Sequence, residues 1–343
     1  MKILIVGNSK PWSIERYFVK YLKEGGAKVT ILGSGDIVYD FHSRNLINKM
    51  LFHSKLVTRY PEVNRLLLKT AGSWRPDLIW VFKGMEIYPG TLDKLRKEGF
   101  RLANYNPDHP FIITSKGSGN KNVTESVGLY DLHFCYQQQL MSDITSKFNI
   151  PCVFLPFAYD PGDMEYMEPS EISEINKLCF QGNPDNYRIH ILAMLADAGI
   201  PVDVFGHGWN KTTLAEKKGV SVYPIASRSA FWRMNQEYRV QLNLFREYNF
   251  GSHNMRTFEI PVVGGIQLTV HSVEQAGFFK DKEEIFFYSD ETELVTRAIE
   301  ILSMNPAKVS EIRTAARKRS LESGYSFRDR SALVLESFKR LCL

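Results

Sequence analysis

The sequence predicts an α/β protein built from two doubly wound, Rossmann-like domains that face a central cleft. Short apolar segments alternate with helical segments along most of the chain, which is typical of parallel strands covered by helices on both faces. The alternation pauses in the polar stretch from Tyr159 to Glu174 and then resumes. The length of 343 residues suits two domains of ~150 residues each.

Six apolar segments of the first half are predicted strands. They occupy residues 2–6, 28–32, 77–82, 102–105, 132–136 and 152–155. Apolar residues from Ile14 to Leu22 recur at helical spacing, and Gly25-Gly26 ends that helix. A long, amphipathic and basic helical region is predicted over 43–71.

The second half repeats this plan. The predicted strands are 178–180, 202–205, 220–223, 240–244, 266–269 and 284–288, and the predicted helices are about 187–198, 228–236 and 292–303. The C-terminal residues are expected to form two helices separated at Gly324. In two such domains the carboxyl ends of the strands meet at the crevice between them, and we expect the ligands there.

Composition indicates a folded, cytoplasmic protein. Apolar residues make up 44% and charged residues 24% of the chain. A net charge of +5 is too small to predict nucleic-acid binding. The cysteines are widely spaced and contain no Cys-x-x-Cys pair, which favours reduced thiols over a metal site. We find neither a secretory leader nor a membrane-spanning apolar run.

Basic residues cluster in the helical region 44–69. They suit peripheral contact with an anionic lipid surface or an anionic glycan, and a solvated helix face is the simpler interpretation. The residues are Arg44, Lys49, His53, Lys55, Arg59, Arg65 and Lys69.

The turn after the first strand argues against a dinucleotide site. A Rossmann fingerprint needs three glycines so that the backbone can approach a pyrophosphate. Here only Gly7 is present, and Pro11 and Trp12 add bulk.

Two turns that follow strands of the second half are candidate ligand contacts. In the first, Gly182 permits close approach and Arg188 falls in the first turn of the next helix, where free N–H groups and a guanidinium suit a diphosphate. A solvated arginine on a capped helix is the alternative. In the second, Gly206 and Gly208 flank His207, either beside a base or sugar or as a structural turn.

The segment 253–269 is the most informative part of the chain. If its short helix starts at Asn254, Arg256 and Glu259 lie three residues apart and share a face. A surface ion pair is the alternative. The helix contains Pro261 and ends at a double glycine, so it is poorly optimised for its own stability, and we favour a ligand-binding role.

The loop after the strand at 102–105 displays Asp108 and His109 between two prolines. Either side chain can act as a general base toward a hydroxyl group. A rigid turn without a chemical role is the alternative, and no second pair of ligands is spaced for a metal site.

With these motifs in place, the chain resembles the GT-B glycosyltransferases, and most closely the CgeB-like (spore-maturation protein) branch of the glycosyl transferases group 1 family. The matching residues are Phe180-Gln181-Gly182-Asn183 with Arg188, Phe205-Gly206-His207-Gly208-Trp209, Asn254-Met255-Arg256-Thr257-Phe258-Glu259-Ile260-Pro261, Gly264-Gly265, Leu268-Thr269, and Gly324-Tyr325-Ser326-Phe327 with Arg330. The resemblance covers most of the second half and, in the first half, the strand pattern and the Asp108 loop.

The resemblance implies a GT-B fold and an enzyme. Residues 1–160 would form the acceptor-side domain, 161–322 the nucleotide-sugar-binding domain, and 323–343 a helix that crosses back to the first domain. The donor would be a UDP- or GDP-type sugar, with no tightly bound cofactor and no metal. Its contacts would be Gly182, Asn183, Arg188, Gly206, His207, Asn254, Arg256, Thr257 and Glu259.

One departure leaves the stereochemistry open. Retaining members of the broader family carry two glutamates separated by seven residues, and the second holds the nucleotide ribose. Glu259 matches the second, whereas Gly251 stands at the position of the first. The expected function is a hexosyltransferase-like enzyme acting on an acceptor hydroxyl of a glycan, lipid or protein. A sugar-nucleotide epimerase of the same fold, or a non-catalytic nucleotide-binding module, is the alternative.

Overall fold

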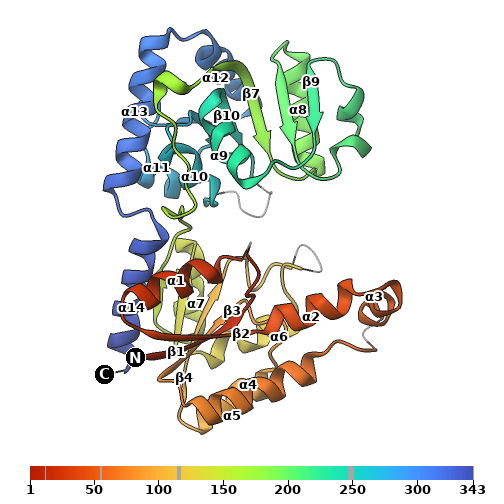
Figure 1. Ribbon diagram of the computed structural model, residues 1–343, viewed down its shortest axis with the longest axis vertical. Coiled ribbons are helices and arrows are strands. Elements are labelled where there is room, and N and C mark those ends of the chain that lie inside the picture. The colour runs from red at the N-terminus through yellow and green to blue at the C-terminus, as the bar shows by residue number, and fades with distance from the viewer. Residues whose placement is uncertain (12, 55, 114–116, 246–250, 343) are drawn as a thin grey trace. The chain divides into compact units, whose positions relative to one another are not determined.

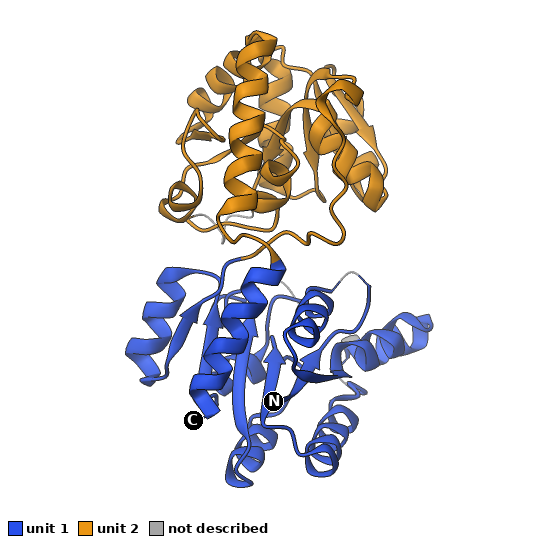
Figure 2. Cartoon of the chain, turned by 60° about the vertical axis from the view of Figure 1, so that its left-hand side comes forward, with its two compact units in different colours: residues 1–156, 327–343 blue, residues 157–326 orange. Residues whose placement is uncertain are grey.

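A computed structural model of the protein describes residues 1–11, 13–54, 56–113, 117–245 and 251–342. The chain divides into two compact units (Figure 2). Unit 1 comprises Met1–Pro156 and Phe327–Leu343, and unit 2 comprises Phe157–Ser326. The domain boundaries expected after residues 160 and 322 therefore shift, and residues 157–160 and 323–326 join unit 2. Trp12 and Lys55 of the sequence motifs lie outside the described residues.

Unit 1 is built on a six-stranded sheet in its described residues, with strand order β2-β1-β3-β4-β5-β6 and parallel pairing throughout (Figure 1). Every strand predicted for the first half is present. The strands are β1 (Lys2–Gly7), β2 (Lys28–Gly33), β3 (Leu78–Phe82), β4 (Arg101–Asn106), β5 (Leu132–Cys135) and β6 (Cys152–Phe154).

Helices cover both faces of this sheet, as alternating apolar side chains require. On one face, α2 (Ser34–Ser43), α4 (Tyr60–Trp74) and α5 (Pro89–Lys97) bury alternate residues of β1, β3 and β4. On the other face, Trp80 contacts Phe18 of α1 (Glu15–Glu24) and Phe338 of α14 (Phe327–Cys342). The C-terminal helix therefore packs on unit 1. The remaining helices of unit 1 are α3 (Leu46–His53), α6 (Lys121–Ser126) and α7 (Gln138–Phe148).

The helical region predicted over 43–71 is divided into separate helices. Helix α2 ends at Ser43, and the region contains α3 and α4, because two local signals interrupt the periodicity. Asn45 is extended, and its side chain accepts a hydrogen bond from the N–H of Asn48 at 2.8 Å, which starts α3 afresh. Arg59 adopts a left-handed conformation and Pro61 occupies the first turn of α4, so the chain turns before that helix.

Unit 2 contains a second parallel six-stranded sheet in the residues that the structure describes, with order β12-β11-β10-β7-β8-β9. It too contains every strand predicted from the sequence. The strands are β7 (Ile175–Gln181), β8 (Val202–Phe205), β9 (Val220–Tyr223), β10 (Tyr238–Asn243), β11 (Gln267–Val270) and β12 (Phe286–Tyr288).

The core of unit 2 lies between its sheet and two helices, α8 (Asn186–Asp197) and α12 (Glu291–Ser303). On the opposite face, Met234 of α9 (Arg228–Glu237) packs against Cys179 of β7. The other helices of unit 2 are α10 (Arg256–Val262), α11 (Val273–Phe278) and α13 (Pro306–Glu322). Both units are therefore doubly wound α/β structures, as the sequence predicts. No described helix is both long enough and apolar enough to span a bilayer.

Candidate functional site

Two adjoining cavities open at the carboxyl end of the unit 2 sheet. One has a volume of about 260 Å³ and the other about 300 Å³, and both are lined by Gln181, Gly182 and Arg256. From β7 the chain builds the sheet outward through β8 and β9, and it then returns to place β10 on the other side of β7. The first cavity lies where these two directions separate, which is where open α/β sheets bind their ligands.

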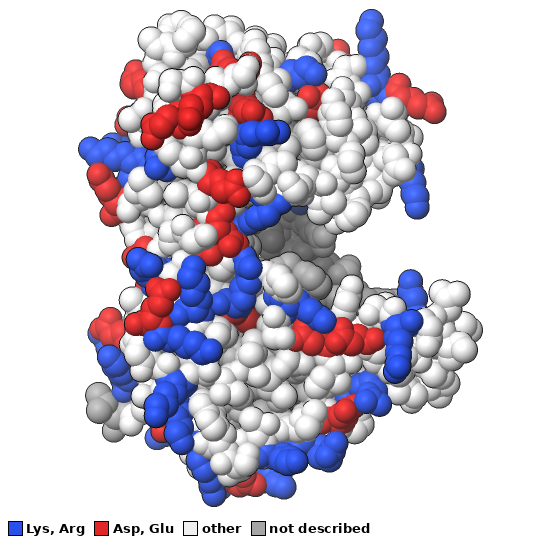
Figure 3. Space-filling view, in the orientation of Figure 1, with Lys and Arg blue, Asp and Glu red and all other residues white. Residues whose placement is uncertain are grey.

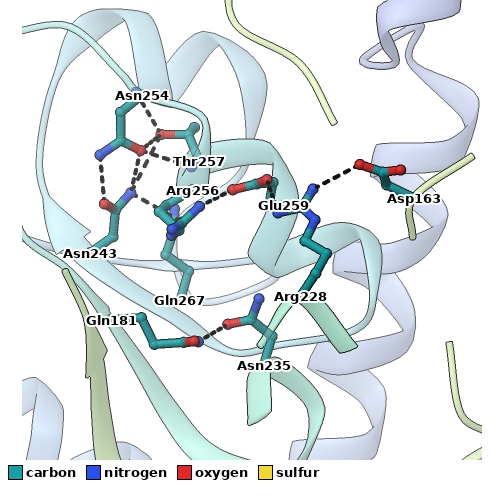
Figure 4. Close-up of polar contacts among 10 residues, drawn as sticks. All are labelled: Asp163, Gln181, Arg228, Asn235, Asn243, Asn254, Arg256, Thr257, Glu259 and Gln267. Carbon is teal, nitrogen blue, oxygen red and sulfur yellow. Dashed lines mark hydrogen bonds and ion pairs between the residues drawn. The ribbon is translucent and has the colours of Figure 1, made fainter. Parts of the chain in front are cut away.

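Glu259 is the buried acid beside these cavities, and it holds two guanidinium groups (Figure 4). Arg256, one turn earlier on α10, donates from Nη1 to Oε2 of Glu259. Arg228, at the start of α9, places its Nη1 3.3 Å from Oε1. A fully buried carboxylate is stable only when it is paired. Glu259 therefore fixes the two arginines, one from each helix, at the edge of the cavities.

Two aromatic rings also contact the same two arginines. The guanidinium of Arg256 lies 4.3 Å from the ring centre of Phe231, and that of Arg228 lies 4.6 Å from the ring centre of Trp232. Arg228 also lies 3.8 Å from Asp163. Stacking on an aromatic face restricts a guanidinium without removing its charge. Both groups are thus preorganised for an anion.

Arg228 was not predicted as a site residue. It lines the second cavity, but nothing in its local sequence separates it from a solvated arginine in the first turn of a helix. The predicted role of Glu259 as an acceptor for ribose hydroxyls stays a prediction. Both of its oxygens pair with guanidinium groups here, and it is not among the residues that line the two cavities.

Asn254 joins the start of α10 to the sheet. Its Oδ1 accepts a hydrogen bond from the N–H of Thr257 at 3.1 Å, and its Nδ2 donates to Oδ1 of Asn243 at 2.8 Å. The helix begins at Arg256, two residues later than the start considered from the sequence, because Asn254 caps it from outside. Asn254 lines the first cavity, whereas Thr257 is fully buried below it.

The two glycine turns lie against each other. A Cβ on Gly206 would come within 2.1 Å of the carbonyl oxygen of Gly182, so the close backbone approach itself requires glycine. Asn183 reaches across with its Oδ1, which accepts the N–H of His207 at 3.1 Å. Gly182, Asn183 and Gly206 line the second cavity, whereas the side chain of His207 is exposed and lines neither cavity.

Arg188 connects the turn after β7 with the end of β10. Its Nη1 donates to the carbonyl of Asn183 and its Nη2 to that of Leu244, both at 2.9 Å. Asp185 caps α8 by accepting the N–H of Arg188 at 2.9 Å. Arg188 lines the first cavity, so its guanidinium lies at the helix start where the sequence predicted it.

Buried amides add donors that the sequence analysis did not identify. Gln181 donates from Nε2 to Oδ1 of Asn235 at 2.9 Å (Figure 4). Within the described residues, Nδ2 of Asn235 and Nε2 of Gln267 have no hydrogen-bond partner. Buried amide groups are normally satisfied, and Asn235 lines the first cavity. An oxygen-rich ligand would supply the missing acceptor there.

A larger cavity of about 540 Å³ lies in unit 2 between the segment 166–174 and α13. It is lined mainly by apolar groups, and two of its cations, Arg313 and Arg317, are engaged by backbone carbonyls. Arg317 donates to the carbonyl of Val262 at 2.7 Å, and Arg313 donates to that of Tyr238 at 3.2 Å. Because its lining is mainly apolar, we do not assign the anion site to this cavity.

Asp108 and His109 lie in unit 1, in the loop after β4. Asp108 pairs with Lys83 at 2.5 Å, and His109 accepts the N–H of Phe111 on Nδ1 at 3.2 Å. Partial burial lowers the pKa of His109, which keeps its imidazole neutral near pH 7. A neutral imidazole is able to take a proton, and the catalytic role of both residues stays a prediction. In the described part of the chain, no three His, Cys, Asp or Glu side chains form a metal-binding group.

Comparison with known proteins agrees with this geometry. Residues 188–336 match the family described as glycosyl transferase-like, and the match includes Arg188, Arg228 and Arg256. The search of curated proteins gave no match.

Solved structures share this fold over nearly the whole chain. HepE of Anabaena, solved with UDP, with UDP-glucose and with UDP and glucose, has a TM-score of 0.68 at 12% identity, over 99% of this chain and 100% of that chain. Sucrose-phosphate synthase of Thermosynechococcus elongatus has a TM-score of 0.70 at 10% identity, over 99% of each chain. A Listeria monocytogenes protein assigned as a UDP-N-acetylglucosamine 2-epimerase has a TM-score of 0.63 at 11% identity, over 98% of this chain and 95% of that chain. The chain therefore has the α/β GT-B fold.

Proposed function

We propose that this protein is a glycosyltransferase that moves a sugar from a nucleoside-diphosphate donor to an acceptor hydroxyl. One observation carries the proposal: Arg188, Arg228 and Arg256 line two adjoining cavities at the switch point of the unit 2 sheet, and Arg256 lines both. A diphosphate is the common anion that needs several cations at one place. The match of residues 188–336 to the glycosyl transferase-like family supports the same conclusion.

The diphosphate is proposed to lie between Arg188 and Arg256, because both line the first cavity. As the bond to the anomeric carbon breaks, negative charge builds up on the leaving nucleoside diphosphate. Fixed cations in a site with little water stabilise that charge without reorganising, and one such donor typically contributes ~100-fold or more in rate. Arg228 lines the second cavity and would contact the same anion from the side of α9.

The sugar is proposed to lie near the buried amides. Asn235 presents an Nδ2 without a partner among the described residues, and sugar oxygens are suitable acceptors. The structurally similar proteins solved with UDP or UDP-glucose make a uridine donor the first to test, with a GDP-type donor as the alternative. We also propose that the transferred group is a hexose and that the protein belongs to the CgeB-like branch.

The acceptor is proposed to bind to unit 1. His109 is the better candidate for the general base, because burial keeps it neutral, whereas Asp108 is paired with Lys83. A base at this place would take the proton of the attacking hydroxyl.

The test is a binding and turnover experiment on the full chain. A panel of UDP, GDP and their hexose conjugates is screened by thermal shift, where a ligand at 100 times its Kd should stabilise the protein by about 2.7 kcal/mol. Hits are then incubated with and without acceptors, and the products are analysed. Release of nucleoside diphosphate coupled to a glycosylated acceptor supports the proposal. An isomerised donor without acceptor indicates an epimerase, and binding without turnover indicates a non-catalytic module.

Arg256 is the residue to change. Arg256→Lys keeps a cation near Glu259, whereas Arg256→Met leaves the buried Glu259 with Arg228 alone. We expect Arg256→Met to lower turnover by about 100-fold and Arg256→Lys to lower it less. Normal turnover in a folded Arg256→Met protein would contradict the assignment.

A further inference from the structure

The outer surface of α3 carries large apolar side chains that face solvent. Leu46, Ile47 and Met50 are 77%, 68% and 72% exposed, and Leu56, just beyond the helix, is 76% exposed. Met50 follows Ile47 by three positions and Leu46 by four, so it lies next to both on the helix surface. Among the described large apolar residues, only Val273 in unit 2 is as exposed, at 81%.

The other side of α3 already holds the helix to unit 1. Phe52 packs against the apolar core under α2 and α4, and its ring lies 5.3 Å from that of His42. The apolar residues of the outer face are thus not needed for packing within the described chain. A contiguous exposed apolar face of this kind is typical of an interaction site.

Basic residues predominate around this face. Residues 41–61 contain four Lys or Arg residues and no Asp or Glu. Arg44 and Lys49 are exposed beside the apolar face, and Arg59, exposed near Leu56, pairs with Glu62. The neighbouring acid Asp40 is paired with Lys10 at 2.8 Å. In Figure 3 the surface around α3 is white with basic side chains beside it. This charge complements an anionic partner.

We propose that α3 and Leu56 dock on an anionic lipid bilayer. Leu46, Ile47 and Met50 enter the boundary between headgroups and acyl chains, and Arg44 and Lys49 contact the lipid phosphates. In Figure 1, α3 lies at the edge of unit 1 beyond α2.

The size of the face favours a bilayer over a protein. An eight-residue helix is about 12 Å long, which is small for a specific protein interface of roughly 800 Å² per partner. A bilayer accepts separate protruding side chains because it has no fixed shape to match, and an amphipathic helix lies in its interface. Binding of this size is weak and reversible. It does not depend on the proposed transferase activity, but together with that activity it would bring the enzyme to acceptors at a membrane surface.

The experiment is flotation of the full chain with vesicles of phosphatidylcholine alone or mixed with phosphatidylglycerol. We expect binding to the mixed vesicles only, weakened by salt. The triple change Leu46→Gln, Ile47→Gln and Met50→Gln should reduce the bound fraction about 10-fold or more, and Lys49→Glu should reduce it less. Val273→Gln is the matched control and should bind like the unchanged protein, because it removes an equally exposed apolar side chain elsewhere.

Several results would overturn the proposal. They are absence of binding to the mixed vesicles, equal binding by the triple variant, and a dimer of the unchanged protein that becomes monomeric in the triple variant, since a second copy would then cover the face. Thermal unfolding of each variant shows that it is folded. Nucleotide binding is measured on the same samples, so that failure of lipid docking with intact nucleotide binding rejects this inference alone.

Discussion

Arg228 at the start of α9 reaches the fully buried carboxylate of Glu259 on α10, with 3.3 Å between Nη1 and Oε1. The two residues are 31 positions apart in the chain, and the pair joins two helices at the carboxyl end of one sheet. With Arg256 on its other oxygen, Glu259 holds two guanidinium groups at the edge of the two cavities.

Changing Arg228 should therefore affect binding and stability together. We expect Arg228→Met to weaken nucleoside-diphosphate binding about 10-fold, because one charged donor is lost. The free energy of unfolding should fall by about 2 kcal/mol, since Glu259 loses one of its two partners. Calorimetric titration and chemical denaturation measure the two effects. Arg233→Met, on the same helix, is the control because Arg233 is exposed, pairs with Glu237 and lines neither cavity. Equal affinities of the two variants would remove Arg228 from the site.

Gly206 should tolerate no side chain. Gly206→Ala places a Cβ 2.1 Å from the backbone oxygen of Gly182, and the two turns must separate. We expect a loss of about 3 kcal/mol in unfolding free energy and weaker nucleotide binding, because both turns line the second cavity.

Gly277→Ala is the matched control for that change. A Cβ on Gly277 meets nothing within 4 Å, and the residue lies in α11. Alanine should leave the stability equal or raise it by up to ~1 kcal/mol, because alanine favours helices. If both substitutions have the same effect, the contact between the turns is not what requires glycine at 206.

His133 should make the protein sensitive to acid. Burial lowers its pKa to about 4, and its Nε2 lies 2.8 Å from the carbonyl of Val127. The folded pKa lies below the unfolded value, so the unfolded chain binds more protons between them. Stability is therefore complete above about pH 6.5 and falls toward pH 4, by about 2 kcal/mol at pH 5. Chemical denaturation near pH 7.5 and pH 5 should show this loss in the unchanged protein and a smaller one in His133→Gln. Equal losses in both proteins would contradict this prediction.

Strand positions could be predicted from the sequence, because a buried parallel strand is a short apolar run regardless of which strands pair with it. The division of the helical region 43–71 was not readable, because the periodicity continues across Asn45 and Arg59. The side chain of Asn45 caps one helix and Arg59 is left-handed before the next, and these features separate the helices. The exposed face of α3 could not be recognised from the periodicity either. Leu46, Ile47 and Met50 fit the pattern of an ordinary packed helix, and only the fold leaves them uncovered.

The sequence by itself determined the doubly wound sheets, the glycine turns and the positions of Arg188 and Arg256, because each depends on local spacing. The tertiary structure decided that Arg228 joins them, that Gly206 is glycine because of Gly182, and that both oxygens of Glu259 pair with guanidinium groups. The reason is physical. Burial of a carboxylate creates a need for counter-charges, and which cations meet that need depends on the elements that the fold brings together at the end of the sheet.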